Sequence, residues 1–191
     1  MNARGLMVLF DSIYLLALAC WVGSIAFFSF GVAPILFKVL GSEAGGKFVR
    51  AFFPRYYLWG AISGAIALPC VVAVPLSFPE LRGPGVGLHA LVVLSATLVM
   101  LYSGNVLTPA INAARDQGEA GAARFRSLHK RSELLNGLVL LVGVALLVAF
   151  AARTRPEGAG IVEPTPAERA SSEASKILRD RPEAGLPDDA R

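Results

Sequence analysis

Charged residues are scarce in this sequence, and long stretches contain none. Only 17% of the 191 residues are Asp, Glu, Lys or Arg, whereas 54% are hydrophobic. The uncharged blocks each reach or nearly reach the ~20 residues that cross ~30 Å of hydrocarbon. They cover residues 12–37, 56–79, 83–114 and 134–152. Blocks of this length exclude a soluble globular core, which would show short periodic apolar runs.

Strict alternation of apolar and polar residues is also missing from these blocks, as residues 139–148 illustrate. Alternation is the pattern of transmembrane β-strands, so its absence favours helices, which satisfy their own backbone groups in lipid. We therefore predict an all-α membrane protein, a four-transmembrane-helix bundle formed by residues 1–152. Its spans are expected at about residues 7–37, 56–76, 86–112 and 131–152.

Cysteine and histidine are rare, with two of each. Cys20 and Cys70 both fall inside predicted spans, so they indicate small buried hydrophobic residues and no disulfide framework. No Cys, Met or second His joins either histidine at metal-ligand spacing. No metal site is therefore predicted.

The two histidines nevertheless raise the alternative of a haem protein. His89 opens the third predicted span and His129 opens the fourth. Because these two spans run antiparallel, the rings are expected near opposite faces of the membrane, where one haem cannot bind both. No cofactor is predicted. A haem with one histidine ligand, or copper, stays as the alternative, and the protein would then be a haem- or copper-linked membrane oxidoreductase.

The final segment, residues 153–191, has a different composition. It carries seven basic and eight acidic residues and is rich in Pro, Ala and Ser, which is too polar to build a core. We predict a polar, largely disordered tail. The capping spacing at Thr165-Pro-Ala-Glu168 leaves open a short helix over residues 166–179.

A polar motif leads directly into the fourth predicted span. In Leu128-His-x-x-Ser-x-x-Leu-Asn136 the side chains of His129, Ser132 and Asn136 are spaced i, i+3 and i+7, so a helix places them on one face, with Glu133 beside them. Polar residues inside a membrane cost free energy and are expected to face the bundle interior.

The other predicted spans carry polar residues that could contact the polar face of the Leu128–Asn136 motif. Together with that face they form a candidate polar intramembrane cluster. Its members are Arg55, Tyr56, Asn105, Asn112, His129, Glu133 and Asn136. Asn105 and Asn136 are expected at the same depth, where their amides would pair between the third and fourth spans. Two interpretations stay open: hydrogen-bonding glue between helices, or a cavity that binds or passes a small solute or a proton, with His129 and Glu133 titrating.

Three further residues indicate how the helices pack. Gly60 and Gly64 form a GxxxG pattern, which lets a neighbouring helix approach closely. Pro34 removes the donor that would bond to the carbonyl of Phe30, so a kink or a helix end is expected there. Residues 38–55 form a connection that contains a short helix lying on the membrane surface.

The distribution of Lys and Arg predicts an orientation. Nine basic residues lie in the first and third connections, against four or five near the other ends of the spans. The nine are Lys38, Lys47, Arg50, Arg55, Arg115, Arg124, Arg126, Lys130 and Arg131. This places both connections in the cytoplasm and both termini outside a multi-pass cell-membrane protein. The expected partners are the lipid bilayer and anionic lipids, with a homo-oligomer left open and no nucleic acid.

Five short motifs occur in order along the predicted membrane domain: Trp21-x-Gly23, Pro34-x-x-Phe37, Phe53-Pro-x-Tyr56, Asn105-x3-Pro109 and the Leu128–Asn136 motif. Together they resemble the uncharacterised bacterial membrane-domain family grouped with transmembrane-protein-205-like proteins, over residues 7–150. The resemblance implies a four-span integral membrane protein without an assigned activity. The first span is also distantly similar to the copper-resistance membrane domain and to membrane-bound haem-dependent protoporphyrinogen oxidase. Their early-span histidines are replaced here by Asp11, Tyr14 and Trp21.

These observations favour a non-enzymatic role for the chain. No nucleophile, base and orienting residue occur together, and no phosphate-binding loop is present. We expect a multi-pass membrane protein of unknown activity that handles a small solute or a proton, or that serves as a membrane scaffold.

Overall fold

The computed structural model describes residues 3–79, 82–153, 171–173 and 175–176. The chain divides into two compact units, Met1–Ala152 and Arg153–Arg191. All regular elements of the described residues are helices, so the all-α class is confirmed. In the second unit, Arg153 and residues 171–173 and 175–176 are helical. The other residues of the predicted tail, including the rest of its expected short helix, lie outside the described residues.

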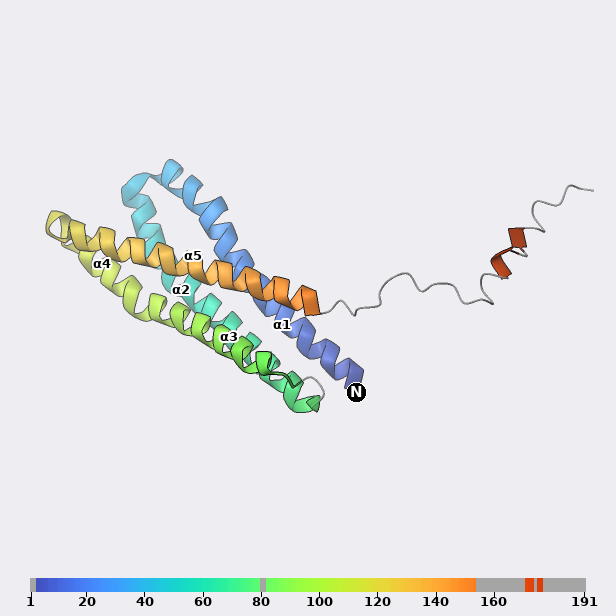
Figure 1. Cartoon of the computed structure of the whole chain (residues 1–191). Helices are drawn as coiled ribbons and strands as arrows, with labels where there is room; N and C mark the ends of the chain where they lie inside the picture. The colour runs from blue at the N-terminus through green and yellow to red at the C-terminus, as the bar shows by residue number, and fades with distance from the viewer. Residues whose placement is uncertain (1–2, 80–81, 154–170, 174, 177–191) are drawn as a thin grey trace, which may run out of the picture. The chain divides into compact units, whose positions relative to one another are not determined.

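The first two helices form an antiparallel hairpin (Figure 1). α1 (Ala3–Ala26) continues through a π-helical segment, η1 (Phe27–Val32), into α2 (Ala33–Ser77). Within α2 the chain reverses at Gly41, whose φ of 69° lies in the left-handed region that glycine adopts readily. As a result Phe28 stacks on Phe52, with ring centroids 5.0 Å apart, and α1 packs along the second half of α2.

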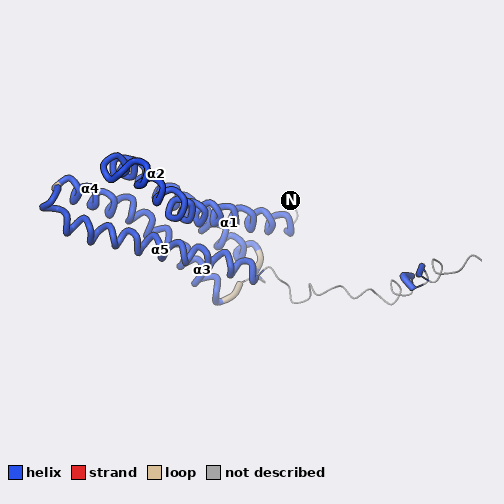
Figure 2. The backbone as a smooth tube through the Cα atoms, turned by 90° about the horizontal axis from the view of Figure 1, so that it is seen from above, coloured by secondary structure: helices blue, strands red, loops and turns tan. Residues whose placement is uncertain are grey.

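The remaining helices of the first unit form a second hairpin beside the first, as Figure 2 shows from above. α3 (Pro84–Tyr102), the π-helical η3 (Ser103–Leu107) and α4 (Thr108–Asp116) make one long arm. The short η4 (Gly118–Gly121) reverses the chain, and α5 (Ala122–Arg153) returns. The turn is tight, because a Cβ on Gly121 would lie 1.9 Å from the carbonyl oxygen of Ala114.

Three segments of the described residues are long and apolar enough to cross a membrane. They are Gly5–Ser77, Gly85–Asp116 and Gly118–Ala152. The first has 73 residues and contains both predicted spans 7–37 and 56–76, so length and composition give three candidates where we predicted four spans. The difference arises because residues 38–55, where we expected a connection, are helical apart from the reversal at Gly41, so both predicted spans fall in one helical segment.

The helix that contains the fourth predicted span begins before that span. We placed residues 113–130 in a polar connection, but α5 is already helical from Ala122. Only residues 117–121 make the turn. The polar run is compatible with a helix because Arg and Lys have good helix propensity and this end of α5 contains neither Gly nor Pro.

Each π-helical segment ends just before a dipeptide that contains proline. The N–H of Ala33 donates to the carbonyl of Phe28, and the N–H of Thr108 donates to that of Ser103, five residues back in both cases. Pro34 and Pro109 follow as the second residues of α2 and α4. The wider turn accommodates the proline within a continuous helix.

Pro34, where we expected a kink or a helix end, lies at the second position of α2 with an exposed side chain. The ring replaces a backbone N–H and changes the hydrogen bonding inside its own helix without touching the bundle core. The glycines of the GxxxG pattern do lie in a helix interface. A Cβ on Gly60 would lie 2.1 Å from Met100 Cε, and a Cβ on Gly64 would lie 2.1 Å from Thr97 Oγ1. Both glycines thus let α2 pack closely against α3 of the same chain.

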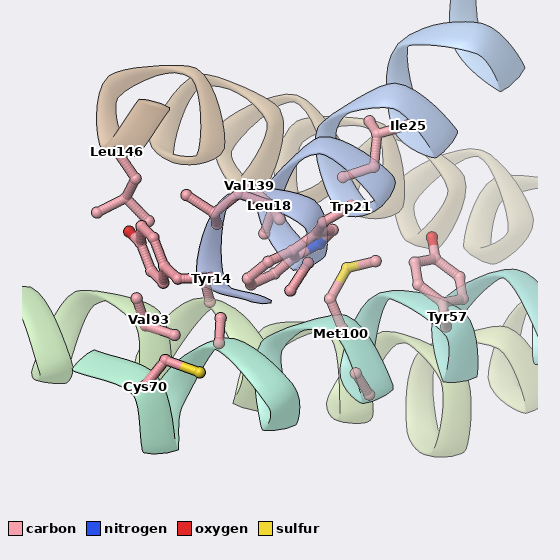
Figure 3. Packing of buried hydrophobic residues seen from close by; sticks show 14 of the residues in the cluster. Tyr14, Leu18, Trp21, Ile25, Tyr57, Cys70, Val93, Met100, Val139 and Leu146 are labelled. Carbon is pink, nitrogen blue, oxygen red and sulfur yellow. The ribbon is translucent and has the colours of Figure 1, made fainter. Parts of the chain in front are cut away.

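The core of the first unit runs between the two hairpins (Figure 3). Its most deeply buried large apolar side chains come from α1, α3 and η3, namely Leu18, Trp21, Ile25, Val93, Met100 and Leu107. Many large apolar side chains point outward instead, as Leu16, Leu134 and Leu141 do with 67%, 73% and 69% of their surface exposed. An apolar exterior of this extent suits contact with lipid.

Candidate functional site

A cavity of about 580 Å³ lies between the first hairpin and α5. Apolar side chains from η1 and α2 form most of its surface, and α5 supplies a polar wall. The lining residues are Phe28, Ser29, Phe30, Ala33, Phe37, Val49, Phe53, Tyr57, His129, Ser132, Glu133, Asn136, Gly137 and Leu140. Its volume is within the range of small-molecule pockets, about 300–1,000 Å³.

The polar wall is the face that the Leu128–Asn136 motif predicts. His129, Ser132, Glu133 and Asn136 all line the cavity. Nε2 of His129 lies 3.3 Å from Oε1 of Glu133, one helical turn away. Both side chains are largely accessible, with exposed fractions of 47% and 66%, so a molecule in the cavity can reach them.

Two adjacent tyrosines of α2 bind this wall from the opposite side. The hydroxyl of Tyr56 donates to Oδ1 of Asn136 at 2.7 Å, and the hydroxyl of Tyr57 lies 2.9 Å from Oγ of Ser132. Nδ2 of Asn136 also donates to Oγ of Ser29 in η1, at 3.4 Å. Figure 3 shows Tyr57 extending from α2 into the space between the helices. These bonds join η1, α2 and α5 around the cavity.

A row of stacked groups supports the cavity from the α4–α5 turn. The guanidinium of Arg115 lies over the ring of Phe125, 5.2 Å from its centroid. The Phe125 ring stacks on that of His129, with centroids 5.5 Å apart and planes 7° from parallel. Arg115 also covers Gly46, where a Cβ would meet its Nη1 at 2.6 Å. The row fixes the His129 ring next to Glu133.

The structure brings only part of the predicted cluster together. Tyr56, His129, Glu133 and Asn136 meet at or beside the cavity. Arg55 is exposed and donates to the carbonyl of Ala51 in its own helix, at 3.1 Å. The other two predicted members, Asn105 and Asn112, lie away from the cavity wall.

The predicted pair of Asn105 and Asn136 is wrong. Asn105 is exposed, and its Nδ2 donates to the carbonyl of Leu101 at 2.9 Å, while Asn136 bonds to Tyr56 and Ser29. Asn105 lies inside η3, whose wider turns rotate the following residues relative to α-helical spacing, so the face deduced from a regular helix does not apply.

Asn112, the other predicted member outside the cavity, contributes through its backbone. Arg50 of α2 donates to the carbonyl oxygen of Asn112 at 3.2 Å and forms an ion pair with Asp116. Asn112 therefore contributes its backbone to the contact between α2 and α4. Figure 1 shows the reversal within α2 and the turn between α4 and α5 at the same end of the two hairpins.

The two histidines occupy separate environments. Nε2 of His89 lies 2.6 Å from the hydroxyl of Tyr14, a contact between α3 and α1, whereas His129 lies beside Glu133 on α5. In the part of the chain that the structure describes, no group of three or more His, Cys, Asp or Glu side chains is placed to hold a metal ion.

Three residues of the site were absent from the predicted cluster. They are Ser29, Tyr57, and Ser132, which bonds to Tyr57. Ser132 belonged to the predicted face and could have been included from its spacing alone. Tyr57 was not included in the predicted cluster, but it is buried, with 3% of its surface exposed. Ser29 carries no signal in the sequence, because it reaches the cavity only through η1 and the folding of the first hairpin.

Comparison with known proteins gives one match. A family described as a domain of unknown function, DUF4149, matches residues 16–120. No curated protein and no solved structure matches the chain. An uncharacterised family is thereby confirmed, and no link to transmembrane-protein-205-like proteins is shown. The match begins at Leu16 within α1, includes the residues of η1 and α2 that line the cavity, and ends before the polar motif of α5. Since it covers more than half of the chain, the protein belongs to the DUF4149 family.

Proposed function

We propose that this membrane protein binds a small amphipathic molecule in the cavity between the first hairpin and α5, without transforming it chemically. The observation that carries the proposal is the two-sided lining of the cavity: aromatic and aliphatic side chains from η1 and α2 face the polar wall of α5. Ligand pockets combine a mainly apolar surface with a few placed polar groups in this way.

The arrangement of the polar groups supports binding over catalysis. The hydroxyl of Ser132 lies against that of Tyr57, and no contact joins it to His129 among the described residues. A nucleophile is activated by a base within hydrogen-bond reach, and Ser132 lacks that pairing here. His129 and Glu133 interact with one another at the accessible surface of the wall, where they can contact a ligand.

We further propose that Gly5–Ser77 crosses the cell membrane twice, which makes four spans in total with both termini outside. The segment has 73 residues, and a straight helix of that length would measure about 110 Å, far more than a bilayer. The antiparallel contact of Phe28 with Phe52 supports two crossings that meet near Gly41. The excess of Lys and Arg in the first and third connections supports a cytoplasmic location for this end.

Cysteine labelling in right-side-out membrane vesicles tests this topology. In a background carrying Cys20→Ala and Cys70→Ala, Ser171→Cys should react with a membrane-impermeant maleimide, whereas Ser42→Cys and Gln117→Cys should react only after permeabilisation. Reaction of Ser42→Cys and Ser171→Cys from the same side would contradict four crossings. If Ser42→Cys and Gln117→Cys react without permeabilisation and Ser171→Cys reacts only after it, the orientation is wrong and the four crossings stand.

Filling the cavity tests the binding proposal. A Cβ on Gly137 meets no atom within 4 Å, so Gly137→Phe should place a ring in the cavity without disturbing the fold. A neutral alkanol that carries a photoreactive diazirine should label cavity residues of the full-length protein in dodecyl maltoside. We expect Gly137→Phe to remove this labelling, as measured by peptide mass spectrometry.

The matched control is Gly23→Phe, because Gly23 also has no neighbour within 4 Å of its Cβ position but lies outside the cavity. It should retain the labelling of the parent protein. If the parent protein, Gly137→Phe and Gly23→Phe are labelled equally at lipid-facing residues and not preferentially in the cavity, the proposed function is wrong.

A further inference from the structure

The charged groups of the cavity all belong to its polar wall. Glu133 is the acid among the lining residues, His129 is the other side chain of the lining that can carry a full charge by protonation, and no Lys or Arg belongs to the lining. Two arginines near the wall contact aromatic rings: Arg115 lies over Phe125, and Arg131 lies over the ring of Tyr102 at 5.3 Å. The carboxylate of Glu133 is thus the fixed negative charge that a ligand meets.

Hydrogen-bond donors on the wall are largely used within the protein. Tyr57 and Ser132 bond to each other, and the amide of Asn136 accepts from Tyr56 and donates to Ser29. An anionic ligand needs free donors or cations, and the wall presents few. A ligand that has a positive charge or N–H donors can instead bind the carboxylate of Glu133.

The backbone of η1 adds another acceptor. The carbonyl of Ser29 would bond to Ala33 N–H in an α-helix, but that N–H donates to Phe28 instead. In a π-helix its donor would be residue 34, which is proline and has no N–H. The carbonyl of Ser29, a lining residue, is therefore left without a donor from the helical ladder.

Aromatic rings surround these acceptors. Phe28, Phe30, Phe37, Phe53 and Tyr57 all line the cavity. The Phe28 ring is held by an edge contact with Phe53 at 5.3 Å and by its stack on Phe52. The face of an aromatic ring carries partial negative charge and attracts organic cations within about 6 Å.

We infer that the cavity accepts an amphipathic organic cation, with its ammonium group beside Glu133 and its apolar part among the aromatic rings. This inference rests on the proposed binding function and specifies the charge of the ligand. The ammonium group belongs either to a freely diffusing alkylamine-type cation or to a lipid headgroup such as choline or ethanolamine. Both sources share the chemistry that the wall recognises.

Competition against the diazirine alkanol in dodecyl maltoside measures the charge preference. Decyltrimethylammonium, decanol and decyl sulfonate have the same chain length and differ in their head groups. We expect half-protection by the ammonium at a concentration at least ~10-fold lower than by the alcohol or the sulfonate, as a cation beside a carboxylate and aromatic rings predicts. Equal protection by all three would refute the cationic ligand while leaving cavity binding intact.

Variants of single residues test which group is responsible for the preference for the ammonium. Glu133→Gln should bring the ammonium to the level of the alcohol and leave protection by the alcohol unchanged. Glu119→Gln removes an exposed carboxylate that does not line the cavity, so it should retain the preference for the ammonium. If Glu133→Gln preserves that preference, the assignment of Glu133 as the counter-charge is wrong.

Lipid addition separates the two sources of the ammonium group. Phosphatidylcholine, phosphatidylethanolamine and phosphatidylglycerol are added in turn at equal concentration to the labelling assay. Protection by the first two and not by phosphatidylglycerol assigns a lipid headgroup, whereas protection by decyltrimethylammonium alone assigns a free cation. Protection by phosphatidylglycerol in preference to the others would overturn the inference.

Discussion

Replacing Gly64 by alanine is expected to lower the stability of the membrane unit by about 1–3 kcal/mol, the usual cost of overpacking a filled interface. The added Cβ would lie 2.1 Å from Oγ1 and 3.1 Å from Cβ of Thr97. Thr97 cannot move away easily, because its side chain is short, buried and bonded to the carbonyl of Val93 at 2.7 Å. Thermal unfolding in dodecyl maltoside, followed by circular dichroism, measures the loss.

Two comparisons separate this clash from a general effect of glycine replacement. Gly60→Ala should cost less than Gly64→Ala, since the atom it meets is the terminal methyl of the flexible Met100 side chain. Gly23→Ala, which meets nothing within 4 Å, should leave the unfolding temperature unchanged or raise it. Adding Thr97→Ala should recover part of the Gly64→Ala loss. An unchanged unfolding temperature in Gly64→Ala would show that α2 and α3 do not pack as described.

Replacing Asn136 by leucine is expected to destabilise the unit by about 1–3 kcal/mol, because the buried hydroxyl of Tyr56 loses its acceptor. Tyr56→Phe removes the donor of the same bond. The two changes should therefore be less costly together than the sum of their separate effects, with a coupling of about 0.6–1.7 kcal/mol. A double-mutant cycle of unfolding free energies measures this coupling.

Asn105→Leu is the control for the cycle. Its amide is exposed and bonds to the nearby carbonyl of Leu101 in the same helical arm, so its loss should change stability little and should not couple to Asn136→Leu. Strict additivity of Tyr56→Phe and Asn136→Leu would contradict the bond between α2 and α5. Coupling between Asn105→Leu and Asn136→Leu would instead favour the pairing deduced from regular helices.

The polar wall of the cavity could be predicted because it depends on one helix. His129, Ser132, Glu133 and Asn136 follow each other at helical spacing in a segment without proline, and α5 has no π-helical turn to disturb that spacing. The opposite side of the cavity depends on contacts far apart in the chain. Tyr57 and Ser132 are separated by 75 residues, and Asn136 and Ser29 by 107.

The sequence alone determined that this protein is helical and belongs in a membrane, because uncharged blocks about 20 residues long have no other stable arrangement in lipid. It also determined which face of α5 is polar. The tertiary structure decided the partners of that face. The turn at Gly41 and the π-helical turns before Pro34 and Pro109 set the rotation and pairing of the helices, and a rotation of one residue moves a side chain from the interior to the lipid. Asn105 faces outward and Ser29 reaches the cavity for this reason.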